Sequence, residues 1–338
     1  MSDRFSELLS KKGVLLADGA TGTNLFNMGL MSGDAPELWN EEKPENIRKL
    51  YRGSIDAGSD LFLTNSFGAN ASRLKLHDAG HRAYELSKIA AELGREEADK
   101  TDRDIIVAGS VGPTGEIMGE AGTLSHGSAV EMFEETARGL IDGGADILYI
   151  ETISAPEEYK AAAEAFGNID APWLGTMSFD TAGRTMMGVT SKEMVALVDD
   201  LAHKPLAYGA NCGVGASDLL RTVLGMRAAN PRLPLIAKGN AGIPKYVDGH
   251  IHYDGTPELM GEYAALARDA GASLIGGCCG TKPEHLREMR KALDERPKGA
   301  VPELSEIEAK LGSFSSENDG TETDTKARPR RNRRRRSA

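Results

Sequence analysis

Three cysteines are the residues whose type and spacing point most directly to chemistry. The 338-residue chain contains only Cys212, Cys278 and Cys279, in the segments NCG and GGCCG. An odd number of cysteines, two of them adjacent, does not favour disulfides, because a bridge between neighbours closes a strained ring. Two interpretations remain: the cysteines are small core residues, as free cysteines often are, or they are ligands of one metal ion.

A catalytic zinc site accounts best for three cysteines. Structural zinc sites usually close with four protein ligands, whereas catalytic sites leave one position for water or substrate. Three thiolates make zinc a weak Lewis acid, and activation of water would favour histidine ligands. Soft sulfur ligation instead favours binding a substrate thiol and holding it as a nucleophilic thiolate. The cysteines therefore predict Zn²⁺ as cofactor and alkyl transfer to a thiol.

Alternating strands and helices must position these cysteines. Short apolar runs predict strands at 14–18, 59–64, 104–109, 146–151, 173–178, 206–211, 234–238 and 273–277. Segments with helical periodicity lie between them, at 44–57, 81–99, 128–142, 156–166, 191–203, 216–229, 257–270 and 283–295. This alternation over about 280 residues predicts an α/β fold, a (β/α)₈ TIM barrel, with a doubly wound open sheet as the competing architecture.

The carboxyl ends of barrel strands meet at one mouth, where active sites are built. Cys212 follows one predicted strand and Cys278-Cys279 follows another, with a single strand between them, so the three thiols are expected to converge. Other polar side chains end strands at the same mouth: Asp18, Thr64, Asn65 and Glu151.

The segments ADGATGTNL, LTNSFGAN, SVGPTGE, YIETI, GRTMMG, GANCGVG, AKGNAGIP and GGCCGT occur in this order. Over about residues 12–295 the chain thereby resembles the homocysteine S-methyltransferase family. That family includes betaine–homocysteine methyltransferases and the homocysteine module of cobalamin-dependent methionine synthase. The resemblance implies a (β/α)₈ barrel, methionine biosynthesis from homocysteine, and zinc held by Cys212, Cys278 and Cys279.

The resemblance also implies two acidic site residues. Glu151 matches the carboxylate that receives the amino group of homocysteine, and Asp18 matches an acid near the same substrate. Each has a structural alternative. Glu151 would then form an ion pair with a neighbouring helix, and Asp18 would cap the turn before Gly19.

Further contacts with the substrate are expected from the loops. Thr64 matches a threonine of the substrate pocket, and Asn65 either hydrogen-bonds its surroundings or fixes the loop. The backbone N–H groups of Gly19 and Ala20 are candidates to bind the homocysteine carboxylate, although glycine-containing loops also serve as plain tight turns.

The methyl donor is less clear from the sequence. Glycine betaine is a quaternary ammonium, and such cations bind in aromatic cages. Trp39 resembles the aromatic residue that contacts betaine in family members, with loop anchoring as the alternative; Phe67 and Tyr149 are further candidates for the cage or the core. Animal betaine enzymes carry tyrosines near Gly68 and Thr152, which this chain lacks. Betaine still ranks first, then a methylated corrinoid protein or methyl-tetrahydrofolate system, then S-methylmethionine or another sulfonium.

Charge is unevenly distributed. The formal net charge is -11, yet residues 326–338 hold one lysine, seven arginines and no acid, which leaves about -19 on the rest. We expect a homocysteine-binding barrel domain over 1–298 and a polar, then arginine-rich, disordered tail over 299–338. A competing hypothesis is a non-catalytic barrel whose basic tail binds nucleic acid or acidic surfaces.

Two other classes are less consistent with the sequence. A zinc lyase or hydrolase is disfavoured because no histidines accompany the cysteines at the strand ends. The chain shows no apolar run of membrane-spanning length and no secretory signal, so a cytoplasmic protein is expected. The sequence leaves the oligomeric state open.

Overall fold

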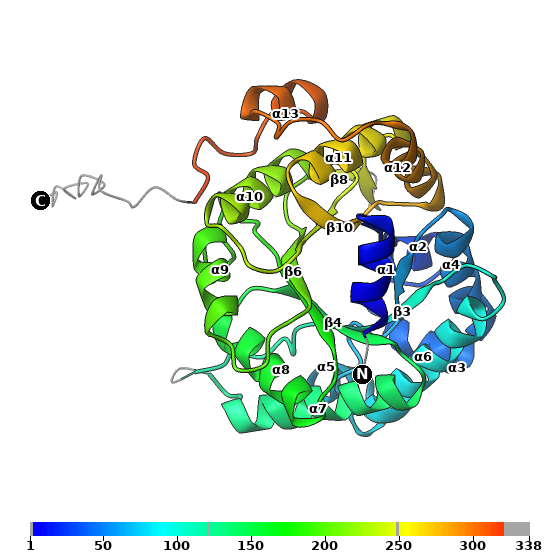
Figure 1. Ribbon diagram of the computed structural model, residues 1–338. Coiled ribbons are helices and arrows are strands. Elements are labelled where there is room, and N and C mark those ends of the chain that lie inside the picture. Colours follow the sequence, from blue (N-terminus) through cyan, green and yellow to red (C-terminus); the bar gives the residue numbers. More distant parts are fainter. Residues whose placement is uncertain (1–2, 120–121, 248–249, 321–338) are drawn as a thin grey trace, which may run out of the picture.

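The computed structural model describes residues 3–119, 122–247 and 250–320. Within them, parallel strands form the inner ring of a (β/α)₈ barrel, as the sequence predicts (Figure 1). The sheet order is β1-β10-β7-β6-β5-β4-β3-β2. The strands are β1 (Leu15–Leu16), β2 (Leu61–Leu63), β3 (Ile106–Val111), β4 (Ile147–Ile153), β5 (Trp173–Met177), β6 (Ala207–Cys212), β7 (Leu235–Gly239) and β10 (Ala272–Gly277).

Helices surround the strands and begin where local signals place them. They are α4 (Pro44–Asp56), α6 (Ala83–Ala98), α7 (His126–Asp142), α8 (Pro156–Asn168), α9 (Ser191–Asp200), α10 (Ala216–Ala228), α11 (Pro257–Asp269) and α12 (Pro283–Glu295). Proline occupies the first turn of four of them, where its missing N–H costs nothing. Gly144 and Gly271, between a helix and the next strand, have φ of 96° and 104°, which glycine adopts without strain.

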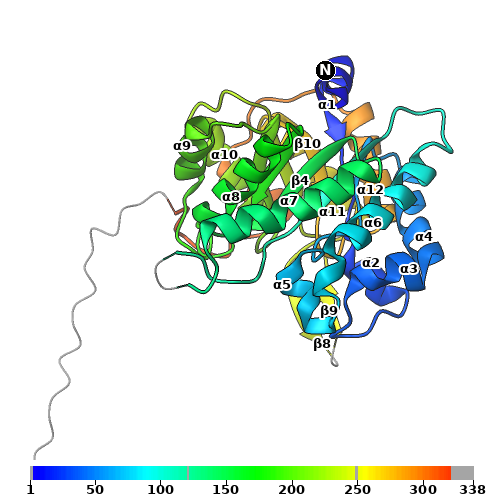
Figure 2. The same ribbon diagram turned by 90° about the horizontal axis from the view of Figure 1, so that it is seen from below.

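The end of the barrel away from the site is covered by a helix that sequence periodicity did not reveal. Helix α1 (Arg4–Lys12) lies across this end (Figures 1 and 2). Its Phe5 and Leu8 are buried in the same apolar cluster as the strand residues Leu15, Leu61 and Ile106. The inside of the barrel is therefore a packed core that α1 completes.

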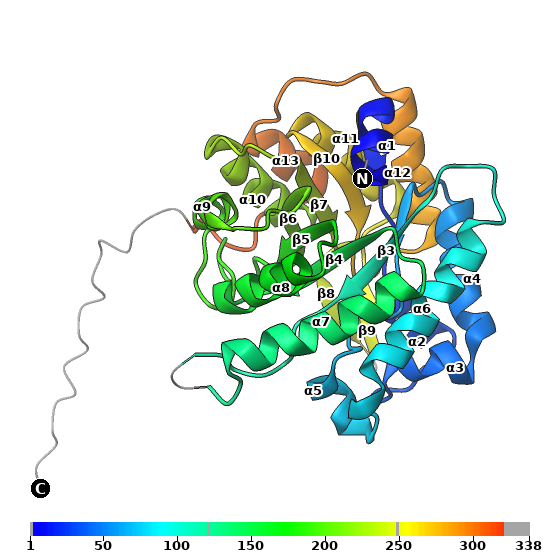
Figure 3. The same ribbon diagram turned by 60° about the horizontal axis from the view of Figure 1, so that its bottom comes forward.

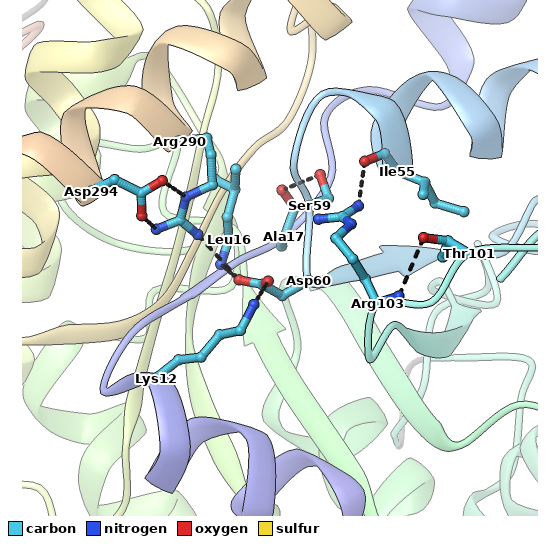
Figure 4. Close-up of polar contacts among 10 residues, drawn as sticks. All are labelled: Lys12, Leu16, Ala17, Ile55, Ser59, Asp60, Thr101, Arg103, Arg290 and Asp294. Atoms are coloured by element: carbon cyan, nitrogen blue, oxygen red, sulfur yellow. Dashed lines mark hydrogen bonds and ion pairs between the residues drawn. The ribbon is translucent and has the colours of Figure 1, made fainter.

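One backbone hydrogen bond and two buried carboxylates join β1 to β2, which share no backbone ladder among the described pairs. The Asp60 N–H donates to Leu16 O at 2.7 Å, and the Asp60 carboxylate accepts the Leu16 N–H at 2.9 Å. Lys12 and Arg290 also contact this buried carboxylate (Figure 4). Nearer the mouth, Asp18 Oδ2 accepts the Leu63 N–H at 2.9 Å. Two carboxylates thus close the seam of the barrel.

Insertions gather at the opposite end, where the loops after the strands lie. They comprise α2 (Gly22–Asn27), η1 (Pro36–Leu38), α3 (Trp39–Glu42), α5 (Ala71–Leu74), η2 (Lys75–His77) and η3 (Gly80–Arg82). An antiparallel hairpin, β8 (Pro244–Val247) with β9 (His250–Tyr253), follows β7 and was not expected from the sequence. Figure 2 shows this hairpin and α5 at the end of the barrel away from α1.

Part of the segment that the sequence analysis assigned to the tail, residues 299–320, is described in the structure and includes a helix. Helix α13 (Leu304–Leu311) buries Ile307 and Leu311 and packs beside α10 and α11 (Figure 3). Beyond it, the Ser315 N–H donates to Asp218 Oδ2 at 3.0 Å. The arginine-rich segment lies outside the described residues.

No helix in the described part of the chain has both the length and the apolar character needed to cross a membrane.

Candidate active site

The three cysteines meet at the mouth of the barrel. Their sulfur atoms lie within 4.8 Å of one another, and those of Cys212 and Cys279 are 3.8 Å apart. Cys212 ends β6, and Cys278 and Cys279 follow β10; β7 pairs with both strands. Two distant segments therefore deliver three soft ligands to one point, as expected from the strand order.

The donor set fits a zinc ion. Zn–S bonds of about 2.3 Å in a tetrahedral site place two sulfur ligands about 3.8 Å apart, which matches the Cys212–Cys279 separation. Hydrogen bonds with Cys212 and Cys278 lower the pKa of Cys279 to about 3. Hydrogen bonds with Cys278 and Cys279, together with burial, raise the pKa of Cys212. Thiolates this close together repel one another, and a bound cation would stabilise all three.

Loop conformation fixes the direction of the thiols. Cys212 has φ of 61°, a left-handed conformation that non-glycine residues seldom adopt. Asn240 joins the two cysteine loops: its Oδ1 accepts the Cys279 N–H at 3.0 Å, and its Nδ2 donates to Gly213 O at 2.9 Å. Asn240 thus holds the loop of Cys212 and the loop of Cys279 together.

Glu151 is directed by an irregularity in β4. The pairing register with β5 shifts between Ile150 and Ile153, and Thr152 has φ of 60°. Asn211 holds this strained residue at two points, accepting its N–H at 2.8 Å and donating to its Oγ1 at 2.7 Å. Such bulges re-aim side chains beside active sites. Because Asn211 precedes Cys212, one amide ties the carboxylate strand to the cysteine strand.

Burial determines the acidity of Glu151. Burial raises the pKa of its carboxyl to about 7, while the charge of Lys238 lowers it and that of Cys278 raises it. Ser110 donates a hydrogen bond to Glu151 Oε1 at 2.6 Å. A partly buried carboxylate with few hydrogen-bond donors is suited to pair with a substrate ammonium.

Asp18 contacts protein groups with both oxygens. Its Oδ1 accepts a hydrogen bond from Lys238 Nζ at 2.6 Å, and its Oδ2 accepts the Leu63 N–H. Burial lowers the pKa of Lys238, but the charges of Asp18 and Glu151 outweigh it and raise that pKa above its usual value. Lys238 is one site residue that the sequence analysis did not single out, although a lysine at the end of the apolar run PLIAK was a signal.

A cavity of about 490 Å³ connects these groups. It is lined by the cysteines and by residues that include Gly19, Ala20, Asn65, Glu151, Lys238 and Tyr253. The Tyr253 ring comes from the unexpected hairpin and lies against Gly280, where a Cβ would come within 2.3 Å of Tyr253 Cγ. Tyr253 also hydrogen-bonds Cys279, which helps to lower the pKa of that thiol.

The other loop candidates are partly engaged within the protein. Ala20 donates its N–H to Thr281 O at 3.1 Å. The Thr64 hydroxyl is buried and accepts the Ser110 N–H at 3.0 Å. Asn65 Nδ2 donates to Pro36 O at 2.8 Å. Asn65 therefore lines the cavity while it also fixes the first loops.

The structure does not bring Trp39 to the cavity. Its side chain is 3% exposed in an apolar cluster with Leu25 and Ile47, and the Lys43 ammonium lies 4.0 Å from its ring centroid. Tyr149 is also buried, with Lys238 Nζ 5.6 Å from its ring centroid. The rings that line the cavity are instead those of Phe26, Phe67 and Tyr253.

Comparison with known proteins identifies the family. The family model described as homocysteine S-methyltransferase matches residues 15–293. The chain belongs to the homocysteine S-methyltransferase family. The matched stretch includes every strand of the barrel and all three cysteines.

Curated relatives of this homocysteine S-methyltransferase family member are much longer. Methionine synthase of Mycobacterium leprae (strain TN) is 30% identical over 305 residues, which cover 86% of this chain and 25% of the relative. Methionine synthase of Mycobacterium tuberculosis (strain ATCC 25618 / H37Rv) is 30% identical over 303 residues, 85% of this chain and 25% of the relative. The chain thus spans about a quarter of these relatives.

A solved homocysteine methyltransferase has a more similar length. The metallated form of MmuM from Escherichia coli is 25% identical, with a TM-score of 0.71, covering 85% of this chain and 99% of that one. Its oxidized form gives a TM-score of 0.70 at 25% identity, covering 86% and 99%.

Proposed function

We propose that this chain transfers a methyl group to the sulfur of homocysteine and so forms methionine. The observation that carries this proposal is the cluster of three cysteine sulfurs that lines one cavity together with the partly buried carboxylate of Glu151. Membership of the family supports homocysteine as acceptor.

Zinc is the metal we propose for Cys212, Cys278 and Cys279, since three soft sulfur donors suit it. When bound, it would keep the homocysteine sulfur as a thiolate at neutral pH. Glu151 pairs with the substrate ammonium and Gly19 offers a backbone N–H near its carboxylate. Asp18 acts through Lys238, which it holds in place. Sulfur then attacks the donor methyl in line, and orientation supplies much of the rate.

Glycine betaine remains the first donor to test. The rings of Phe26 and Tyr253 at the cavity suit a methylated cation better than the buried Trp39. A methylated corrinoid or methyl-tetrahydrofolate system is the second candidate, favoured by the similarity to methionine synthases.

The decisive experiment measures methionine formed from homocysteine with three donors in parallel: glycine betaine, S-methylmethionine and a methylated corrinoid. Turnover with betaine supports the full proposal. Turnover with the corrinoid alone retains homocysteine methylation and overturns the donor ranking. Absence of methionine with every donor, from zinc-loaded protein, contradicts the proposed activity and favours the non-catalytic hypothesis.

A further inference from the structure

Arg73 is a cation at the cavity that the proposed handling of homocysteine does not use. It lies in α5, in the loop after β2, and it lines the cavity with Phe67 and Glu37. Its Nε donates to Pro113 O at 2.9 Å, and its guanidinium carbon is 5.4 Å from the Phe67 ring centroid. These two contacts hold the group in place.

The guanidinium has no direct ion pair in the described part of the chain. The one hydrogen bond that it makes to the described residues uses Nε, which leaves the terminal nitrogens for another acceptor. Glu37 is an acid of the same wall, but its Oε1 accepts the Gly68 N–H at 2.6 Å. A half-buried arginine with free terminal donors is suited to bind a planar carboxylate.

Charges at the cavity fall into two groups. The pKa of Glu151, raised by burial, responds to Lys238, Cys278 and Asp18. Burial raises the pKa of Glu37; backbone hydrogen bonds at Glu37 and Gly68, and then the charges of Arg73 and His77, only partly offset this increase. Homocysteine carries its ammonium and its carboxylate on the same carbon. A homocysteine molecule bound to Glu151 through its ammonium therefore keeps its carboxylate near Lys238 and Asp18. The charges around Glu37, Arg73 and His77 are left for the methyl donor.

We propose that Arg73 binds the carboxylate of the methyl donor and thereby selects small zwitterions that carry both a methylated onium centre and a carboxylate. This inference rests on the proposed function. A cavity of about 490 Å³ lies within the range of about 300–1,000 Å³ usual for small-molecule sites. Phe26 and Tyr253 offer their rings to the cationic part of such a donor.

The chemistry balances for this class of donor. A lone pair of the homocysteine thiolate forms the new S–CH₃ bond, and the bond from that methyl to the onium nitrogen or sulfur breaks. Its electron pair stays on the onium atom, which becomes a neutral amine or thioether. The donor carboxylate is unchanged, so Arg73 holds the same group before and after transfer.

Two sulfonium donors that differ in a carboxylate test the proposal: dimethylsulfonioacetate and trimethylsulfonium. In zinc-loaded protein, Arg73→Met is expected to lower kcat/KM for dimethylsulfonioacetate and for glycine betaine by about 100-fold. The value for trimethylsulfonium should change by less than about threefold, since it offers Arg73 no anion. Arg73→Lys should retain part of the activity, because it keeps the charge and loses the planar fork.

Lys75→Ala is the matched control, because it removes a cation two positions away that pairs with Glu116 and does not line the cavity. It should leave all three donors unaffected. An equal fall with both sulfonium donors in Arg73→Met, or an increase in the KM for homocysteine, overturns the proposal.

Failure of the proposed function gives a different result. If the wild-type protein forms no methionine from any donor, calorimetry with glycine betaine and homocysteine-loaded protein decides about Arg73. Binding that is lost in Arg73→Met supports the carboxylate site, and absence of betaine binding to wild type overturns it.

Discussion

Lys238 Nζ lies 2.6 Å from Asp18 Oδ1, although 220 positions separate the two residues. Both side chains are buried, and β10 lies between their strands in the sheet. The pair joins the beginning of the barrel to its seventh strand in the cavity wall. Each partner therefore makes the burial of the other tolerable.

Loss of one partner should be costly. Lys238→Met leaves the Asp18 carboxylate buried without its cation, so we expect the free energy of unfolding to fall by about 3–5 kcal/mol. Urea denaturation followed by circular dichroism measures this. The double variant Asp18→Asn/Lys238→Met should recover at least half of the loss, and Lys291→Met on the surface should have no effect. A single variant as stable as wild type would contradict a buried ion pair.

Metal content should depend on each cysteine. Wild-type protein loaded with zinc and then dialysed should retain about one zinc per chain. Cys278→Ser should retain little, since a serine hydroxyl does not ionise to replace a thiolate. Elemental analysis gives the content, and the melting temperature of the unloaded proteins shows that the variant is folded. Full retention of zinc by Cys278→Ser would rule out the proposed ligand set.

Binding of homocysteine should weaken in acid. Because burial raises the pKa of Glu151 to about 7, the carboxyl is increasingly protonated below that pH and offers no charge to the substrate ammonium. The KM for homocysteine should therefore rise about tenfold between pH 8 and pH 6 relative to Glu151→Gln. Ionisation of the homocysteine thiol affects both proteins equally, so the ratio of their KM values at each pH reports on Glu151 alone. Parallel profiles for the two proteins would show that Glu151 does not bind the ammonium.

The Glu151 carboxyl should make the protein less stable as pH rises, whereas a carboxyl whose pKa is lowered on folding makes it more stable. The pKa of Glu151 in the folded protein lies above the ordinary glutamate value of 4.5, so folding favours the protonated form. Stability is then lost as pH rises from about 4.5 to 7, by up to about 3 kcal/mol. Metal-free Glu151→Gln should be more stable than wild type at pH 8 and similar at pH 4.5. Exposed Glu164→Gln provides the control in the same denaturation series.

The segment after α13 should contribute to stability. Truncation after residue 312 removes the Ser315 N–H and the Ser316 carbonyl that Asp218 and Arg221 contact, and the Phe314 ring 4.5 Å from the Arg221 guanidinium. Exposure of the Asp218–Arg221 pair should lower the free energy of unfolding by about 1–3 kcal/mol, which is measured as a lower melting temperature. Truncation after residue 320 is the control, because every contact described here remains. Equal stability of the two truncations would show that this packing is incidental.

Sequence patterns predicted the barrel because each of its signals is local. Proline at the first position of α4, α8, α11 and α12 marks where these helices begin. The three cysteines follow strands whose order in a barrel is set by the chain, so their convergence could be expected from the sequence alone. The distances between the sulfur atoms could not be predicted from the sequence, because they depend on backbone conformation. The same holds for the amides of Asn211 and Asn240, which orient the site.

The features that the sequence did not reveal all depend on contacts between distant segments. Lys238 looked like the end of an apolar strand, because its partner Asp18 is 220 positions away. Arg73 occupies an irregular loop with no period to place it. Helix α13 buries only Ile307 and Leu311, too few apolar residues to stand out in a polar segment. Pairwise contacts between distant segments decide all three, and no local pattern contains them.

The seam between β1 and β2 is where the barrel can open transiently. The Leu16 and Leu63 amides are protected from exchange with solvent only while Asp60 and Asp18 continue to accept them. Separation of these two strands near the mouth would also free the carboxylate that holds Lys238. Asp18 therefore links the β1–β2 junction to Lys238, which lines the cavity. A transient opening of the barrel and a transient loss of the assembled site would be the same event, visible as exchange of a single amide at Leu63.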